Sequence, residues 1–416
     1  MNSAKRIIHV PRRFVVDEWG GTETVIAAMV EQQRLQGWLP EIHTSRALSR
    51  VSSELWHDVP VERYSYCYPF FGLSDAQRHQ LDKKGGNMLS LSLLFSMLRA
   101  KDVRLFHAHT LKRLGGAVML AAHQKHKPFV VTLHGGVYDV PAAEQKEMLA
   151  AQDGKMEWGK VFGAIFHSRA LLEEADAVIC VGRTEYERAL AALSHKRVYH
   201  VGNGVDAERF KAGDGTAFRT EHSIPADAFV LGCYCRIDPQ KDQLSLVEAF
   251  DRLAASHPLV YLVLSGPCTS SDYLAQLDLR IAASPHATRI RRLGAISNEG
   301  TVLPNAYHAC DVFVLPSRHE PFGIVVLEAW SAGKPVVVAE VGGLRHLVTD
   351  AENGLFFPSG DSAALAACLE RLILNPDLRD SLGAAGQQLA RSQYSWKQVA
   401  HETERVYQLA EVRVQK

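Results

Sequence analysis

The sequence predicts an α/β protein built from two doubly wound parallel sheets. Its 416 residues exceed what one ordinary hydrophobic core accommodates, so two domains are expected. Short apolar runs without polar alternation, typical of strands buried on both faces, recur along the chain. Segments with helical spacing separate these runs, which is the pattern of strand, crossover helix and parallel strand.

The first domain is expected over residues 1–205 and opens with a strand, a glycine turn and a helix. We expect strands at 5–10, 39–45, 103–109, 129–133, 177–181 and 197–201, and helices at 22–36, 88–98, 115–126, 141–175 and 184–193. Residues 46–85 are rich in Tyr, Ser and Pro. We interpret them as an irregular segment that forms either a substrate-binding surface or a packed aromatic corner.

The second domain is expected over residues 206–394 and repeats the alternation. Its opening, residues 207–228, is polar and interrupted by glycine and proline. We expect strands at 229–235, 259–265, 289–293, 312–315 and 335–339, and helices at 243–255, 272–283, 301–309, 323–333, 363–374 and 378–391. A glycine turn is expected at 342–343, and a last helix runs over 396–412.

Composition excludes several classes of protein. The chain has 47% apolar and 22% charged residues, and 46 basic residues balance 46 acidic ones, so nothing argues for a nucleic-acid partner. The seven cysteines are odd in number and form no C-x-x-C pair, which favours buried free thiols in a reducing compartment. No apolar run is long enough for a signal peptide or a membrane span. We therefore expect a cytoplasmic protein.

Residues 311–330 carry the chemistry around which the chain is organised. An apolar strand ends at Leu315, prolines interrupt the chain, and a helix starts near Phe322, Gly323 and Ile324. Glu320 lies in the loop at the carboxyl end of the strand, and Glu328 lies inside the helix. Carboxylates suit the hydroxyls of a sugar, and the free backbone N–H groups of a helix start suit phosphate. This combination predicts a nucleotide sugar, whereas the alternative is two solvated surface glutamates.

The same stretch resembles a known family. Seven residues separate Glu320 from Glu328, and Ala-Trp-Ser-Ala-Gly-Lys-Pro-Val-Val follows. This context resembles the E-x7-E signature of retaining glycosyltransferases of family four, which have the two-domain GT-B fold. The loop Asn203-Gly-Val-Asp206 is similar to the family's linker between domains. The resemblance also implies that the C-terminal helix, about 395–416, packs back on the first domain.

Two cations follow the first strand of the second domain. Arg236 and Lys241 are five residues apart at the expected carboxyl edge of the sheet, where both can reach one diphosphate, although a solvated surface is the alternative. The resemblance implies that they are the family's pair for the donor diphosphate. The chain contains no Asp-x-Asp triplet. We therefore expect no metal and no cofactor, with the cations and the helix start balancing the phosphate charge instead.

The first domain offers a glycine turn and a histidine loop. Gly20 and Gly21 lack a Cβ and would let the backbone approach a phosphate or sugar, or they form a plain turn. His134 precedes two glycines at a strand end and is either structural or, as the resemblance implies, in contact with the donor sugar. His107 and His109 lie on one face of a strand, but the spacing identifies no third metal ligand.

Taken together, these features predict a retaining, metal-independent glycosyltransferase. We expect it to move a sugar from a nucleoside diphosphate to a glycan, a lipid-linked molecule or a small hydroxyl acceptor, as in the synthesis of cell-surface polysaccharide. The expected catalytic residues are His134, Arg236, Lys241 and Glu320, and because they belong to both domains, we expect the domains to close over the donor. The alternatives are a GT-B sugar phosphorylase, a nucleotide-sugar epimerase and a non-catalytic nucleotide-sugar sensor.

A basic stretch in the first domain raises the question of a membrane. Its members are Lys83, Lys84, Arg99, Lys101, Arg104, Lys112 and Arg113. A solvated basic face is the simpler interpretation, and weak peripheral contact with an anionic inner leaflet is the alternative.

Overall fold

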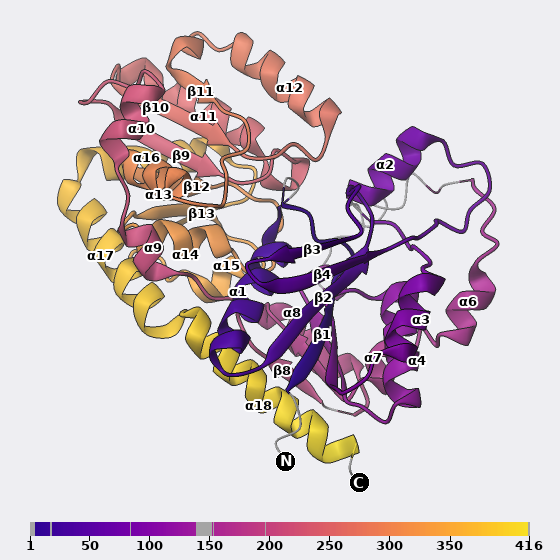
Figure 1. Cartoon of the computed structure of the whole chain (residues 1–416). Coiled ribbons are helices and arrows are strands. Elements are labelled where there is room, and N and C mark those ends of the chain that lie inside the picture. Colours follow the sequence, from indigo (N-terminus) through magenta and orange to yellow (C-terminus); the bar gives the residue numbers. More distant parts are fainter. Residues whose placement is uncertain are drawn as a thin grey trace. The chain divides into compact units, whose positions relative to one another are not determined.

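A computed structural model describes residues 5–16, 19–83, 85–138, 152, 154–195 and 197–414. The chain forms two compact units (Figure 1). Unit 1 comprises Met1–Gly202 with Trp396–Lys416, and unit 2 comprises Asn203–Ser395. These limits lie close to the expected ones, after residues 205 and 394.

Unit 1 contains an eight-stranded sheet in the order β3-β4-β2-β1-β5-β6-β7-β8. Its strands are β1 (Arg6–Val10), β2 (Leu39–Ser45), β3 (Ser53–Trp56), β4 (Val59–Tyr64), β5 (Val103–Ala108), β6 (Phe129–Leu133), β7 (Ala177–Cys180) and β8 (Val198–His200). All pairs are parallel except β3 with β4. The strand order reverses between β1 and β5, which makes the carboxyl ends of these two strands the switch point of the sheet.

Helices surround this sheet. They are α1 (Gly21–Leu35), α2 (Asp75–Lys83), α3 (Leu91–Arg99), α4 (Lys112–Gln124), α6 (Lys160–Ile165), α7 (Leu171–Glu174), α8 (Arg183–Ala192) and α18 (Trp396–Val414). The C-terminal helix α18 packs on α1, as the resemblance implies, and its buried Tyr407 hydroxyl lies 3.1 Å from Gln33 Nε2. Among the described residues, no helix has both the length and the apolar character that a bilayer crossing requires.

Unit 2 contains a parallel six-stranded sheet in the order β11-β10-β9-β12-β13-β14. Its strands are β9 (Phe229–Tyr234), β10 (Val260–Ser265), β11 (Ile290–Arg292), β12 (Val312–Leu315), β13 (Val336–Ala339) and β14 (Leu355–Phe357). Numbered from the first strand of the unit, this order is 3-2-1-4-5-6, the order of dinucleotide-binding sheets, with the switch point between β9 and β12.

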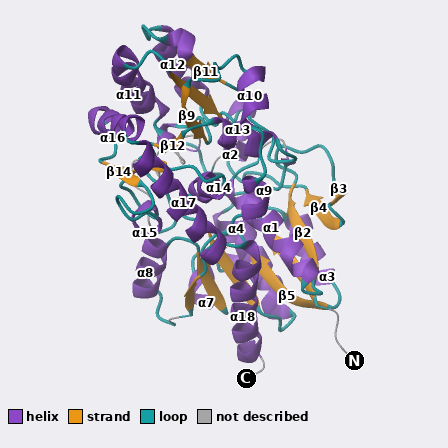
Figure 2. Cartoon of the chain, turned by 90° about the vertical axis from the view of Figure 1, so that its left-hand side faces the viewer, coloured by secondary structure: helices purple, strands orange, loops and turns teal. Residues whose placement is uncertain are grey.

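Helices cover both faces of the second sheet (Figure 2). They are α9 (Ala207–Lys211), α10 (Gly215–Glu221), α11 (Gln243–Ser256), α12 (Ser271–Ala282), α13 (Val302–Ala309), α14 (Ile324–Ser331), α15 (Leu344–Leu347), α16 (Ser362–Leu374) and α17 (Pro376–Gln393). Val326, Leu327 and Trp330 of α14 are fully buried and pack into the core of the unit, whereas Ile324 and Val325 are only partly buried. This packing fixes the start of α14 beside the end of β12.

Several expectations need correction. Residues 46–85 are not irregular, since they contain β3, β4 and α2. His57 and Asp58 join β3 to β4 with positive φ angles of 46° and 62°, the conformation that joins tight hairpins, but His-Asp is not the usual Asn-Gly signal. Short elements were also missed, namely α9, α10, α15 and β14. The first part of the helix expected over 141–175, residues 141–151 and 153, lies outside the described residues, and the remainder contains the two short helices α6 and α7 in place of one continuous helix.

The cysteines also differ in part from expectation. All seven are free, and Cys180, Cys233, Cys235 and Cys310 are buried in the sheets or against them. Cys67, in contrast, is exposed. An isolated apolar neighbourhood in the sequence therefore does not guarantee burial.

Candidate active site

The switch point of unit 2 collects the charged residues that the sequence singled out. Arg236 and Lys241 follow β9, whereas Glu320 and Glu328 follow β12. Because β9 and β12 are parallel neighbours, the loops after them leave the same edge of the sheet. Residues nearly 80 positions apart are thereby brought into contact, since Lys241 Nζ donates a hydrogen bond to Glu320 Oε2.

The Lys241–Glu320 ion pair is almost fully buried. Each side chain is only 10% exposed, and Lys241 lies in the short 3-10 helix η3 (Pro239–Lys241). Two opposite charges at such a site stabilise one another, because each would be costly to bury alone. An anionic ligand could replace the carboxylate as the partner of the ammonium group.

The loop after β9 is held in place by Asp238. Its carboxylate accepts hydrogen bonds from the Gln240 backbone N–H, at 2.9 Å, and from the Thr269 hydroxyl. Gln240 Nε2 donates to the His319 carbonyl at 2.9 Å, which ties this loop to the loop after β12. Arg236, whose side chain is 33% exposed, lies 3.8 Å from Asp238 between Nη1 and Oδ2. The guanidinium is therefore restrained and still accessible to solvent.

Glu328 is buried one turn inside α14 and has a partner that the sequence did not reveal. Its Oε2 accepts a hydrogen bond of 2.7 Å from the hydroxyl of Tyr307, a buried residue of α13. Burial raises the pKa of Glu328, an effect that the Tyr307 hydrogen bond opposes. Its Oε1 accepts no hydrogen bond from any residue that the structure describes. One oxygen orients the carboxylate and the other remains available for a ligand.

A glycine turn after β13 supports the Glu320 loop. Gly343 N donates to the Glu320 carbonyl at 2.7 Å. A Cβ at Gly342 would lie 2.3 Å from that carbonyl oxygen, and one at Gly343 would lie 2.1 Å from the Pro321 oxygen. No side chain fits either position. The sequence predicted a turn here, and the structure shows that this turn also fixes the position of Glu320. Gly323 precedes α14 with a left-handed φ of 102°.

The glycine turn of unit 1 already contacts an internal anion. Gly20 N donates to Glu23 Oε2 at 3.1 Å, and Glu23 is buried near Arg13, 3.4 Å away between Oε1 and Nε. Gly21 is the first residue of α1. A phosphate at this helix start would have to compete with the Glu23 carboxylate.

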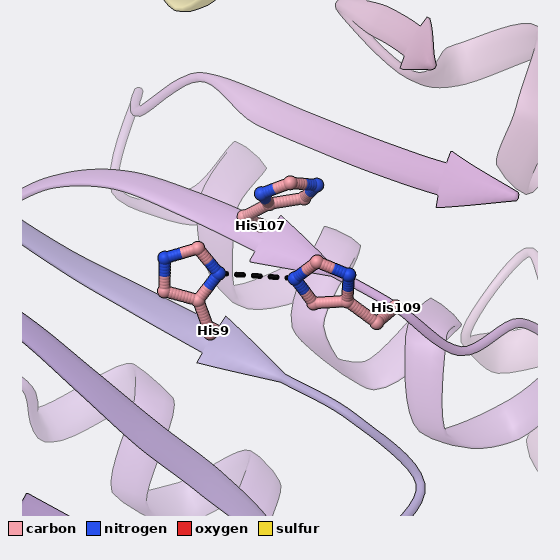
Figure 3. Close-up of side chains that lie close together, drawn as sticks. All are labelled: His9, His107 and His109. Carbon is pink, nitrogen blue, oxygen red and sulfur yellow. Dashed lines mark hydrogen bonds between the residues drawn. The ribbon is translucent and has the colours of Figure 1, made fainter. Parts of the chain in front are cut away.

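His134 ends a group of four neighbouring histidines. His9, from β1, lies beside His107 and His109, and one ring nitrogen from each of the three lies within 4.8 Å of the other two (Figure 3). His134 Nε2 lies 2.9 Å from His109 Nδ1. Burial lowers the pKa of His9 and of His134 to about 4, so the rings are neutral at pH 7. His9 is the third histidine that spacing could not identify, because it comes from another strand.

The basic stretch of unit 1 is partly neutralised within the unit. Arg104 forms an ion pair with Glu411 of α18, and buried Arg113 forms one with Glu157. These two cations add less to a basic face than the sequence alone indicates.

Comparison with known proteins follows the same division of the chain. The model described as Glycosyltransferase Family 4 matches residues 19–209, and the model described as Glycosyl transferases group 1 matches residues 214–389. The chain is 33% identical over 301 residues to a D-inositol 3-phosphate glycosyltransferase of Saccharomonospora viridis, covering 70% of this chain and 67% of the relative. It is 32% identical over 277 residues to a glycogen synthase of Mycobacterium tuberculosis, covering 65% and 63%.

The chain thus spans about two thirds of the length of these curated relatives. Its fold is similar to that of HepE from Anabaena, whose crystal structure contains UDP-glucose, with a TM-score of 0.72 and 20% identity over 99% of this chain and 100% of that one. Sequence and fold agree with the resemblance of the E-x7-E stretch. The chain is therefore a glycosyltransferase of family four and has the GT-B fold.

Proposed function

We propose that this protein transfers a glycosyl group from a nucleoside diphosphate sugar to a hydroxyl acceptor, with retention of anomeric configuration and without a metal ion. The observation that carries the proposal is the charged switch point of unit 2, where two cations follow β9 and two carboxylates, one in a loop and one in α14, follow β12 at the same sheet edge. The HepE structure with UDP-glucose supports a nucleotide sugar as the donor.

Arg236 and Lys241 are proposed to hold the diphosphate. Lys241 is paired with Glu320 in the structure, and the partly exposed Arg236 contacts Gln240 and Asp238. A bound diphosphate would replace Glu320 as the partner of Lys241. The negative charge of the diphosphate grows as its bond to the sugar breaks. Fixed cations then stabilise the transition state more than the ground state. This is the role that a divalent ion has in metal-dependent transferases.

The two glutamates are proposed to bind different sugars of the donor. Glu328, oriented by Tyr307, presents Oε1 to the ribose hydroxyls, and its buried position suits neutral hydrogen-bond donors. Once Lys241 turns to the phosphate, Glu320 is free to accept hydrogen bonds from hydroxyls of the transferred sugar. Glu320 therefore lies next to the reacting carbon, whereas Glu328 does not.

His134 of unit 1 is proposed to accept a hydrogen bond from a sugar hydroxyl. Acceptors considered are a glycan, a lipid-linked molecule and a small polyol, and the two curated relatives act, by their names, on D-inositol 3-phosphate and in glycogen synthesis. For retention we propose front-face attack, in which the leaving phosphate takes the proton of the acceptor hydroxyl. The new glycosidic bond forms as the bond from the sugar to the phosphate breaks, and the nucleoside diphosphate leaves with the proton.

A donor panel tests the proposal. The purified protein is incubated with UDP-, GDP-, ADP- and dTDP-sugars in EDTA, with candidate acceptors, and release of nucleoside diphosphate is measured. We expect release from one class of donor and a product with the donor's anomeric configuration by NMR. Lys241→Ala serves as the inactive control. Binding without release would indicate a sensor, strict dependence on inorganic phosphate would indicate a phosphorylase, and conversion of the donor sugar without transfer would indicate an epimerase.

A further inference from the structure

Four side chains of unit 1 form one continuous hydrogen-bonded chain. It starts at Gln33 of α1, whose Oε1 lies 2.8 Å from His9 Nε2. His9 Nδ1 lies 3.0 Å from His109 Nε2, a contact drawn as the dashed line in Figure 3. His109 Nδ1 in turn lies 2.9 Å from His134 Nε2. Gln33, His9 and His109 are all buried, so water does not interrupt the chain.

The Gln33 amide gives this chain a direction. Its Nε2 donates to the Tyr407 hydroxyl at 3.1 Å, so its Oε1 must accept from His9 Nε2–H. A neutral imidazole carries one N–H, and His9 Nδ1 is therefore an acceptor for His109 Nε2–H. By the same rule His109 Nδ1 accepts from His134 Nε2–H, which leaves a lone pair on His134 Nδ1. If the oxygen and nitrogen of the Gln33 amide were exchanged, donor and acceptor would be exchanged at every hydrogen bond along the chain.

A second branch accounts for His107. Its Nδ1 lies 2.7 Å from the Tyr407 hydroxyl, and its Nε2 lies 2.7 Å from Thr132 Oγ1. Every ring nitrogen of His9, His107 and His109 thus has a hydrogen-bonding partner. The His107 and His109 rings lie beside each other, with centroids 4.1 Å apart and planes tilted by 36°. The geometry favours a hydrogen-bond network over a metal site.

The backbone that follows His134 is fixed as well. Glu185, fully buried in α8, accepts hydrogen bonds from the N–H groups of Gly135, at 3.0 Å, and Val137, at 3.1 Å. Ring and backbone of His134 are therefore both restrained from within unit 1.

We propose that Gln33, His9 and His109 are positioning residues that hold His134 as the Nε2–H tautomer, so that its Nδ1 accepts a hydrogen bond and cannot donate one. His134 then recognises a hydroxyl group of the substrate through the hydroxyl proton. Only this last step rests on the proposed function, because the tautomer is a property of the unliganded protein.

Imidazole nitrogen NMR of the unliganded, full-length protein measures the tautomer directly. Long-range proton–nitrogen correlations distinguish the protonated from the unprotonated ring nitrogen, and His134→Asn assigns the signal. We expect one tautomer at pH 7.5, with the proton on Nε2. A proton on Nδ1, an equal mixture, or rings shifted by a metal that EDTA removes would each overturn the proposal.

Two matched variants test the role of the chain. His9→Phe removes the acceptor of His109 and should give His134 a mixture of tautomers. His107→Phe removes an equally buried ring from the other branch and should leave His134 as Nε2–H. Retention of the single tautomer in His9→Phe would overturn the positioning role, and if that variant does not fold, the wild-type spectrum still decides the direction. The donor panel is independent of these spectra, so either proposal can fail alone.

Discussion

The two sheets of this protein have the same kind of switch point and opposite chemistry. In unit 1, the ends of β1 and β5 are lined by neutral, mutually hydrogen-bonded imidazoles. In unit 2, Arg236 and Lys241 follow β9, and Lys241 is paired with the Glu320 carboxylate from the loop after β12. The fold supplies the same position in both units, whereas the side chains decide the ligand. Neutral acceptors suit hydroxyls, and fixed cations suit a diphosphate.

Removing Lys241 should produce the largest effect, because the charges of unit 2 depend on each other. Lys241→Met leaves the Glu320 carboxylate buried without its partner, at a cost of about 3–5 kcal/mol in the free energy of unfolding. The double variant Lys241→Met/Glu320→Gln should regain most of that stability, yet remain inactive. Urea unfolding and donor turnover measure the two effects. If Lys241→Met is as stable as the wild type, the Lys241–Glu320 pair does not stabilise this edge of the sheet.

Acid should weaken unit 1 and spare unit 2. The pKa of His9 is about 4 in the folded protein because burial disfavours its charged form, whereas an unfolded histidine titrates near 6.5. Below pH 6.5 the unfolded state binds more protons, so stability falls until about pH 4, by about 3 kcal/mol for His9 alone. The pKa of Glu328 is raised, which gives unit 2 stability that is lost as pH rises instead.

Hydrogen exchange read by mass spectrometry resolves this difference between the units. Protection in β1 and β5 should fall between pH 6.5 and 4 once intrinsic exchange rates are corrected. Protection in β9 and β12 should not fall with it. His9→Phe serves as the control, since it removes one of the titrating groups and should reduce the pH dependence. Equal loss of protection in both units would remove the contrast.

Sequence reasoning predicted the strongly buried strands and singled out the charged residues that follow β9 and β12. The strand over 129–133 and the strand over 312–315 were predicted to the residue, because each is an apolar run that its flanking residues limit. The order of the strands explains why sequence reasoning did not find the contributions of His9 and Tyr307. His9 and Tyr307 act through neighbours on other strands and helices, and one sequence does not show which elements become neighbours. The turn at Gly342 and Gly343 was identified, but not the loop that it supports.

Separating the roles of the two glutamates should give a smaller, more specific effect. Glu328→Gln weakens the proposed contact with ribose, which is the same in ground and transition states, so the donor KM should rise ~10-fold with kcat nearly unchanged. Glu320→Gln should act mainly on kcat, by ~10- to 100-fold, because charge develops on the transferred sugar. Steady-state kinetics with the donor from the panel measures both. The reverse pattern would exchange the two assignments.

Tyr307→Phe should give the smallest effect. It removes the 2.7 Å hydrogen bond that orients Glu328, worth about 1 kcal/mol, and should raise the donor KM ~5-fold without changing kcat. Tyr234→Phe is the matched control, because the Tyr234 hydroxyl is also buried in unit 2 but donates to the Ala306 carbonyl. The same KM for both variants would mean that Tyr307 acts only through packing.

The central claim is that the charged edge of unit 2 binds a diphosphate through side chains of the protein. Isothermal titration of the full-length protein with UDP, GDP, ADP and dTDP in EDTA tests it most directly, with Arg236→Ala and Lys241→Ala beside the wild type. We predict that one nucleotide binds in EDTA and that each substitution weakens its affinity at least ~10-fold, by loss of a charge-assisted hydrogen bond. Binding that requires a divalent ion, or that neither substitution changes, would contradict this account.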